Sequence, residues 1–230
     1  MWTQHKLQDF LRANKDAWRF AAKASDDYVL ARCGMINGLW SAFEMATQAT
    51  EKFLKSYLLF KDQTLLGSAD KMRKAVRVKA KGSKDESEHN IRVCLDLAAA
   101  AGLPFSAKFA YRITRINSYY SQRYPDKRGL TYMGAGEVHD LDEVVFQIWD
   151  AFKQVNDDYY HVCGLMGPVY SFYLDRGTQW AELGSGTYKI MTFNNRAFED
   201  RKADIERGIL QRLSGWQNAP AVAAYGGPRS

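Results

Sequence analysis

The sequence predicts an all-α fold, an antiparallel bundle of helices with further helices at both ends. Apolar residues recur at intervals of three and four through most of the 230-residue chain, and strand-like segments do not alternate with helical ones. The clearest segment is residues 39–60, where polar side chains lie between the residues of a wide apolar face and no glycine or proline occurs. A long helix is therefore expected at the centre of the bundle.

Two shorter helices are expected before this central one. Residues 2–23 have the periodicity of a first helix, and residues 26–36 that of a second, which Asn37-Gly38 ends or bends. Ser25 precedes two acidic residues and has the form of an N-terminal cap, because its hydroxyl accepts from free backbone N–H groups and acids there favour the helix dipole. A break is thus expected near residue 24.

A cluster of positive charge follows the central helix. Seven basic residues occur between positions 71 and 84 with no acidic residue among them: Lys71, Arg73, Lys74, Arg77, Lys79, Lys81 and Lys84. The formal net charge is +6, so removing these seven charges leaves −1 for the rest of the chain. The alternation of Val76 and Val78 with charged residues is typical of a short exposed strand or hairpin arm. Either this segment contacts the phosphates of a nucleic acid or nucleotide, or it is a solvated loop without a ligand.

Two helices are expected after the basic segment. Residues 89–101 form the first, which ends near Gly102. Residues 107–122 form the second, capped by Ser106 and stopped by Pro125.

Three further segments complete the chain. Asp140, with Glu143 three positions later, has the form of a capping box that opens a helix at residue 141. Residues 184–193 are expected to be a turn with a short strand. Residues 195–213 are expected to be the last amphipathic helix.

The organisation predicted from these elements has four parts. They are an N-terminal helix (1–24), a helical bundle (25–158), a C-terminal helical extension (159–216) and a flexible tail (217–230). Apolar residues make up 46% of the chain, enough for one sizeable core.

Composition also bounds the cellular setting. No run approaches the roughly 18 to 20 apolar residues that a membrane span needs, and the first residues are too polar for a signal peptide. The three cysteines are odd in number and far apart, as expected of reduced thiols. We therefore expect a cytoplasmic protein that does not enter a membrane.

Polar side chains gather on one side of the expected central helix. Gln48, Glu51, Lys52 and Lys55 come from nearly consecutive turns, and Glu51 with Lys55 is an i,i+4 pair in the favourable order. One interpretation is a polar pocket that holds a phosphate or nucleotide together with Arg123, whose planar fork suits such a group. The other is a structural ion-pair network that fixes the register of the helices.

Four pieces of the sequence, taken in order, resemble the HEPN family of helical-bundle domains. They are Asp26-Asp27, the run Q-A-T-E-K-F-L-K from Gln48 to Lys55, the helix led by His89, and the ending Arg123-Tyr124-Pro125-Asp126. Members of that family show a Q-A-x-E-K-x-x-K-A helix, a His-led helix and a helix ending in R-Y-P. The resemblance covers about residues 25–155. It implies a four- to five-helix bundle that dimerises, in a nucleotide- or RNA-linked setting such as a toxin, antitoxin or antiviral module.

The sequence departs from the ribonuclease members of that family, which carry an Arg, four to six further residues and then a His. None of the four histidines, His5, His89, His139 and His161, has an Arg at the required distance before it. The nuclease activity is therefore not carried over. The resemblance then favours the non-catalytic members, which act as binding or assembly modules or pair with a nucleotidyltransferase-like partner. The alternative is a divergent, metal-independent ribonuclease that uses His139 or His161 with a different cation.

A di-metal carboxylate site is a more remote alternative. Glu86-x-x-His89 and Asp158-x-x-His161 have the i,i+3 spacing of metal ligands in helical bundles. The facing carboxylates such a site needs are missing, because Glu44 and Glu51 belong to one helix. No glycine–serine elbow or phosphate loop is present either. We expect neither metal nor other cofactor.

The leading hypothesis is a dimeric, non-catalytic binding module for a nucleotide, an RNA or a partner protein. The residues expected to bind the ligand are Gln48, Glu51, Lys52, Lys55, Arg123, Tyr124 and Asp126. The seven basic residues between positions 71 and 84 are expected to bind nucleic acid.

Overall fold

The computed structural model describes residues 4–62, 64–65, 68–119, 134–175 and 180–217. Within these ranges the secondary structure is helical and no strand occurs, which confirms the expected all-α class. Arg123, Tyr124 and Asp126 lie outside the described residues, as does the tail from residue 218.

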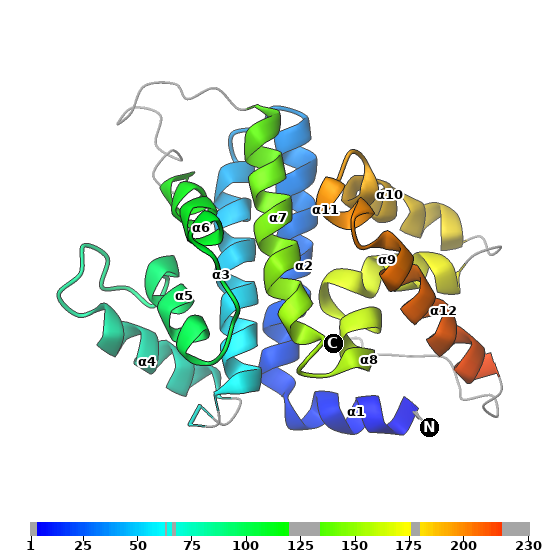
Figure 1. The fold of residues 1–230 in the computed structure, drawn as a ribbon, viewed down its shortest axis with the longest axis horizontal. Helices are drawn as coiled ribbons and strands as arrows, with labels where there is room; N and C mark the ends of the chain where they lie inside the picture. The colour runs from blue at the N-terminus through cyan, green and yellow to red at the C-terminus, as the bar shows by residue number, and fades with distance from the viewer. Residues whose placement is uncertain (1–3, 63, 66–67, 120–133, 176–179, 218–230) are drawn as a thin grey trace, which may run out of the picture.

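Three long helices form the centre of the molecule (Figure 1). They are α2 (Lys15–Ile36), α3 (Ala42–Lys61) and α7 (Ala135–Phe152). A short turn joins α2 to α3, so the two run antiparallel and pack along each other, and α7 packs on both. The expected central helix is confirmed as α3, although it begins at Ala42 rather than at residue 39.

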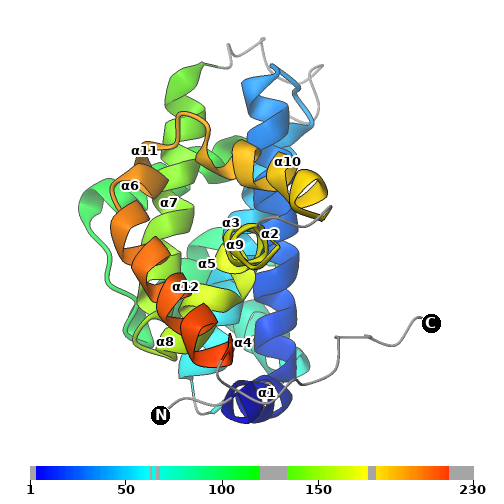
Figure 2. The same cartoon turned by 90° about the vertical axis from the view of Figure 1, so that its right-hand side faces the viewer.

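Shorter helices cover the two sides of this centre (Figures 1 and 2). One side carries α4 (Ala69–Ala80), α5 (Ile91–Ala100) and α6 (Ala107–Tyr119). The other side carries α8 (Asp157–Val162), a 3-10 turn (Gly164–Met166), α9 (Gly167–Leu174), α10 (Trp180–Thr192), α11 (Arg196–Glu199) and α12 (Lys202–Gln217). Helix α1 (Gln4–Ala13) crosses one end of the molecule.

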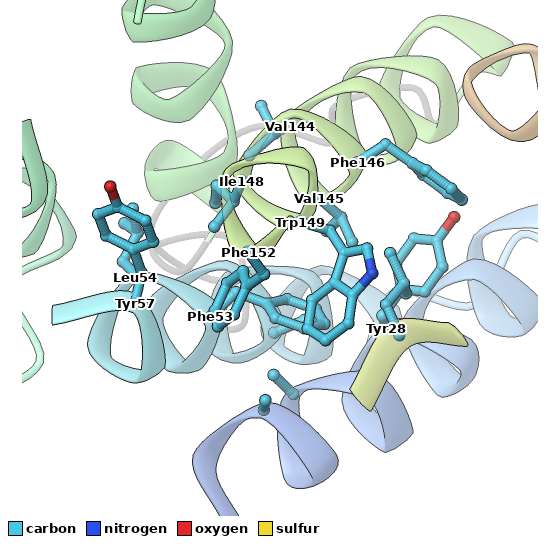
Figure 3. Close-up of a cluster of buried hydrophobic side chains, with 14 of the residues drawn as sticks. Tyr28, Phe53, Leu54, Tyr57, Val144, Val145, Phe146, Ile148, Trp149 and Phe152 are labelled. Carbon is cyan, nitrogen blue, oxygen red and sulfur yellow. The ribbon is translucent and has the colours of Figure 1, made fainter. Parts of the chain in front are cut away.

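The core between α2, α3 and α7 is rich in aromatic side chains (Figure 3). Trp149 and Phe152 on α7 stack with their ring centroids 4.6 Å apart, and Phe53 on α3 meets Trp149 edge-on at 5.9 Å. The indole N–H of Trp149 donates to the carbonyl of Tyr160 at 3.2 Å, so the one polar atom of this side chain has a partner inside the core. Aromatic packing thus holds α8, the start of the C-terminal extension, against the bundle.

Gly164 permits this close packing. Its φ of +48° lies in the left-handed region that side chains disfavour, and a Cβ atom there would lie 2.3 Å from Cη2 of Trp149. Only glycine therefore fits between the end of α8 and the indole ring.

The expected break near residue 24 is wrong. Helix α2 continues through this region, and Ser25 lies buried in its middle rather than capping a new helix. The break lies earlier, where the side chain of Asn14 donates to the carbonyl of Phe10 at 2.9 Å and ends α1. The boundary drawn at 24/25 falls inside one helix because buried residues follow each other at helical spacing on both sides of it: Ala17, Ala21, Ala24 and Tyr28.

The capping box at Asp140 is also wrong. Helix α7 begins at Ala135, where the side chain of Glu137 accepts from the backbone N–H of Gly134 at 2.9 Å. Asp140 is buried one turn later and binds Arg112 and Arg115 instead, as described below.

Two predictions for the C-terminal extension are corrected. The strand expected within 184–193 is the second half of α10, where Tyr188 stacks on Phe172 at 4.0 Å. The helix expected over 195–213 is divided into α11 and α12. Asn195 caps α11 by accepting from the backbone N–H of Phe198 at 3.0 Å, and its side chain also donates to Tyr28 of α2 at 2.9 Å.

Candidate functional site

The first candidate cluster is centred on Glu51 in α3. One carboxylate oxygen, Oε1, accepts from Nζ of Lys55 at 2.5 Å and from Nδ1 of His89 at 2.9 Å. The side chain of Lys55 is 2% exposed and that of Glu51 is 8% exposed, so the ion pair is almost entirely withdrawn from water. Charges buried in this way must neutralise each other. The contact of Glu51 with His89 links α3 to the segment that leads into α5.

The neighbouring polar residues of α3 form a chain along the helix surface. Glu44 accepts from Gln48 at 3.2 Å, and Gln48 in turn accepts from Nζ of Lys52 at 3.1 Å. Lys52 also pairs with Asp27, a buried acid on α2. Each of these side chains has a protein partner, and the contact of Lys52 with Asp27 ties α3 to α2.

The basic segment is helical as far as Ala80, which corrects the expected strand or hairpin arm, and Lys81 and Lys84 follow in the loop after the helix. Ser68 caps the N-terminus of α4, where its side chain accepts from the backbone N–H of Lys71. The helix buries Met72, Val76 and Ala80 against the bundle, because these residues recur every four positions along one face. The alternating valines that suggested a strand therefore differ in environment: Val76 is buried and Val78 is 69% exposed.

The basic residues of α4 and its C-terminal end fall into two groups. Lys71 and Lys74 lie on the side opposite the buried face, and Lys81 continues this row beyond the end of the helix. All three are exposed, and within the described residues none takes part in an ion pair. We call Lys71, Lys74 and Lys81 the lysine face. Lys79 and Lys84 are exposed as well, outside this row.

The two arginines of α4 have carboxylate partners. Arg73 binds Asp70 at 3.0 Å, and it also lies 3.7 Å from the carboxylate of Glu88, which Arg77 contacts as well. Glu88 belongs to the loop between α4 and α5, next to His89. The seven basic residues predicted as one site thus divide into paired arginines and unpaired lysines.

An ion-pair network between α6 and α7 went unnoticed in the sequence. Asp140 accepts from Nε of Arg112 at 3.0 Å and from Nη1 of Arg115 at 2.6 Å, and Glu137 accepts from Nη2 of Arg115 at 2.7 Å. The sequence does contain a pattern that could have indicated this network. Arg112 and Arg115 are three positions apart on one helix, and Glu137 and Asp140 have the same spacing on another.

A second unnoticed network is buried between α2, α7 and α10. Arg32, 1% exposed, binds Asp142 through Nε at 2.9 Å and donates to the carbonyls of Ile190 and Phe193 at the end of α10. Burial raises the pKa of the Asp142 carboxyl, although the Arg32 guanidinium opposes the shift. Beside it, a hollow of about 370 Å³ is lined by apolar side chains of Cys33, Ile36 and Phe193.

The two histidines considered for ribonuclease chemistry have different environments. His161 is 3% exposed, donates from Nδ1 to the carbonyl of Asp157 at 2.8 Å, and presses against Gly208, where a Cβ would lie 2.1 Å from Nε2. Burial lowers the pKa of His161. His139 is half-buried, and its Nε2 lies 3.4 Å from Nη2 of Arg112.

The buried cysteines and the candidate metal ligands were also compared with the requirements of a reactive site. Burial raises the pKa of the Cys94 thiol to about 12 and that of Cys163 to about 12, so neither is a thiolate at neutral pH. Within the described ranges, no group of three or more His, Cys, Asp or Glu side chains is placed to hold a metal ion. Glu86 binds the backbone N–H of Gly82 at 2.8 Å.

Comparison with models of known protein families, with curated proteins and with solved structures found no match to this chain. For the part of the chain that the structure describes, no helix has both the length and the apolar composition needed to cross a membrane.

Proposed function

We propose that this protein is a HEPN-like, non-catalytic module that binds the phosphate backbone of RNA through the lysine face of α4. The observation that carries the proposal is the row of three exposed lysines, for which the described residues provide no carboxylate partner. Cations that lack protein partners release counterions when they bind phosphates, which favours association with a nucleic acid.

The chemistry of the surface favours phosphate contact over base recognition. The stretch from Ala69 to Asn90, which covers α4 and the following loop, contains no Phe, Tyr or Trp. Proteins that stack bases place aromatic side chains between their cations. Binding through α4 should therefore depend strongly on salt and little on RNA sequence.

The HEPN-like part of the proposal is supported by one contact. Glu51, from the Q-A-T-E-K-F-L-K run, binds His89, which leads into α5. Two pieces of the resemblance that lie 38 residues apart thus meet in the bundle. Because Glu51 and Lys55 neutralise each other out of reach of solvent, we assign them to the stability of the bundle.

The resemblance to the HEPN family also supports a proposal about oligomeric state and partner. We propose a cytoplasmic homodimer, which a nucleotidyltransferase-like protein joins. Size-exclusion chromatography with light scattering measures the mass of the isolated protein. A mass of one chain, 26.2 kDa, at micromolar concentration would contradict the dimer.

The binding proposal is tested with two triple variants of equal charge. One replaces the lysine face with glutamine (Lys71, Lys74 and Lys81), and the other replaces exposed lysines on other helices (Lys6, Lys15 and Lys108). Both reduce the formal net charge from +6 to +3. Fluorescence anisotropy with a labelled RNA hairpin should show weak binding for the first variant and nearly wild-type binding for the second. Equal binding by both would refute the proposal, and nucleotide or protein ligands would then be tested with the same variants.

The second candidate function is a divergent, metal-independent ribonuclease that uses His139. The observation in its favour is that Nη2 of Arg112 lies 3.4 Å from Nε2 of His139. An arginine and a half-buried histidine thus meet, although they lack the sequence spacing found in the ribonuclease members of the HEPN family. Incubation of structured RNA with the protein in EDTA tests this candidate. Cleavage that His139→Ala removes and His161→Ala retains would favour the ribonuclease over the non-catalytic module.

A further inference from the structure

The carboxylate of Glu88 lies among three cationic or ionisable groups. Arg77 contacts its Oε2 atom, while Nε of Arg73 and Nε2 of His89 lie 3.7 and 3.8 Å from Oε1. Arginine holds phosphate and carboxylate groups through the paired N–H groups of its guanidinium, so two arginines beside one acid make a place where an anion can bind.

Burial differs between the acid and its partners. The Glu88 side chain is 16% exposed, whereas those of Arg77 and His89 are 65% and 63% exposed and that of Arg73 is 42% exposed. The two arginines and His89 are therefore more accessible to solvent than the carboxylate between them. A phosphate reaches them without opening the core of the protein.

The hydrogen bonding of Glu88 is incomplete. Its Oε2 atom is buried, and within the described residues it has a charged neighbour but no hydrogen bond of acceptable geometry. A buried acceptor without a hydrogen bond lowers stability, so the contact is weaker than its charges alone would suggest. An anion that satisfies the guanidinium groups more fully can compete with it.

The two arginines of this group are continuous with the lysine face. At about 100° per residue, Arg77 lies roughly 60° from Lys74 around the helix, and Lys81 falls between them. An RNA backbone that follows the lysine face therefore brings its next phosphates toward Arg77 and Arg73.

We propose that Arg73, Arg77 and His89 form a phosphate-binding cradle that Glu88 occupies in the free protein. The carboxylate acts as an internal competitor, and a phosphodiester of the bound RNA displaces it. This inference rests on the proposed RNA binding, since it names a further part of the same surface and the device that restrains it.

The test compares two glutamates of the same loop. Glu88→Gln removes the charge that competes for the arginines, and Glu86→Gln removes an equal charge from a side chain whose contact is the backbone N–H of Gly82. Anisotropy with the RNA hairpin should show binding about five- to tenfold tighter for Glu88→Gln, as expected for one added charge-assisted contact. The slope of log K against log salt should also steepen by about one unit for that variant, while Glu86→Gln leaves the slope unchanged.

A triple variant identifies the source of the gain. Adding Arg73→Gln and Arg77→Gln to Glu88→Gln should abolish the tighter binding, because the cradle is then absent. Circular dichroism verifies that each protein is folded. Should Glu88→Gln fail to fold, Glu88→Asp, whose shorter side chain withdraws the carboxylate, takes its place with the same expectation.

The outcomes separate this inference from the proposed function. Wild-type affinity and slope for the folded Glu88 variant, with weak binding by the lysine-face variant, would overturn the cradle alone. Equal binding by the lysine-face variant and its control would overturn the proposed function, whereas a gain in hairpin binding for Glu88→Gln would still support the cradle as a phosphate site.

Discussion

Nδ1 of His89 lies 2.9 Å from Oε1 of Glu51, and the same oxygen accepts from Nζ of Lys55 at 2.5 Å. A single atom thus joins the central helix to the segment that carries Glu88 and leads into α5. The buried pair supports the bundle, and the nearby surface of α4 carries the proposed binding.

Replacing Lys55 with methionine should destabilise the protein strongly. The change leaves the Glu51 carboxylate buried with only the exposed His89 as a partner, which costs about 3 kcal/mol. Urea denaturation measures the loss. The double variant Glu51→Leu, Lys55→Met removes both charges and should recover part of it. A loss below about 1 kcal/mol for the single variant would show that the pair is not held out of water.

Gly164→Ala should destabilise the protein by about 3 kcal/mol or more. The added methyl group would overlap the indole ring of Trp149, and the residue would keep a strained positive φ. The matched variant is Gly167→Ala, since a Cβ at that position meets no atom within 4 Å. Thermal unfolding should show a large fall in Tm for the first and little change for the second. Equal Tm values would contradict the packing described here.

The free energy of unfolding should decrease in mild acid because of the buried His161. Burial lowers its pKa in the folded state below the ordinary value of 6.5, so between these two pKa values the unfolded chain binds a proton that the native protein does not. Stability is therefore full above the unfolded pKa and falls as the pH decreases toward the folded pKa. Urea midpoints measured from pH 8 to pH 5 should decline less steeply for His161→Gln. Parallel slopes for the two proteins would exclude this histidine as the cause.

Much of the fold was predictable because apolar periodicity reports burial directly. The central helix α3 follows from its own pattern, as do α5 and α6. The errors arose where a local polar signal was overridden by packing. Ser25 and Asp140 look like caps in sequence, yet both are buried within helices, where tertiary partners use their polar atoms or surround them.

The candidate site was predictable only in part. Spacing along one helix indicated the Glu51–Lys55 pair, because i,i+4 neighbours meet regardless of the rest of the fold. It did not indicate Asp27 as the partner of Lys52, or Glu88 as the partner of Arg77, since both contacts depend on how separate elements are placed. The division of the basic segment into a lysine face and paired arginines therefore required the structure.

The salt dependence of RNA binding tests the central claim most directly. The association constant of the hairpin is measured by anisotropy from about 50 to 200 mM salt for the wild type, the lysine-face variant and the control with Lys6, Lys15 and Lys108 replaced. Loss of three phosphate contacts should make the slope of log K against log salt shallower by about two to three units in the lysine-face variant only. Identical slopes for the two triple variants would contradict the assignment of α4 as the RNA-binding surface.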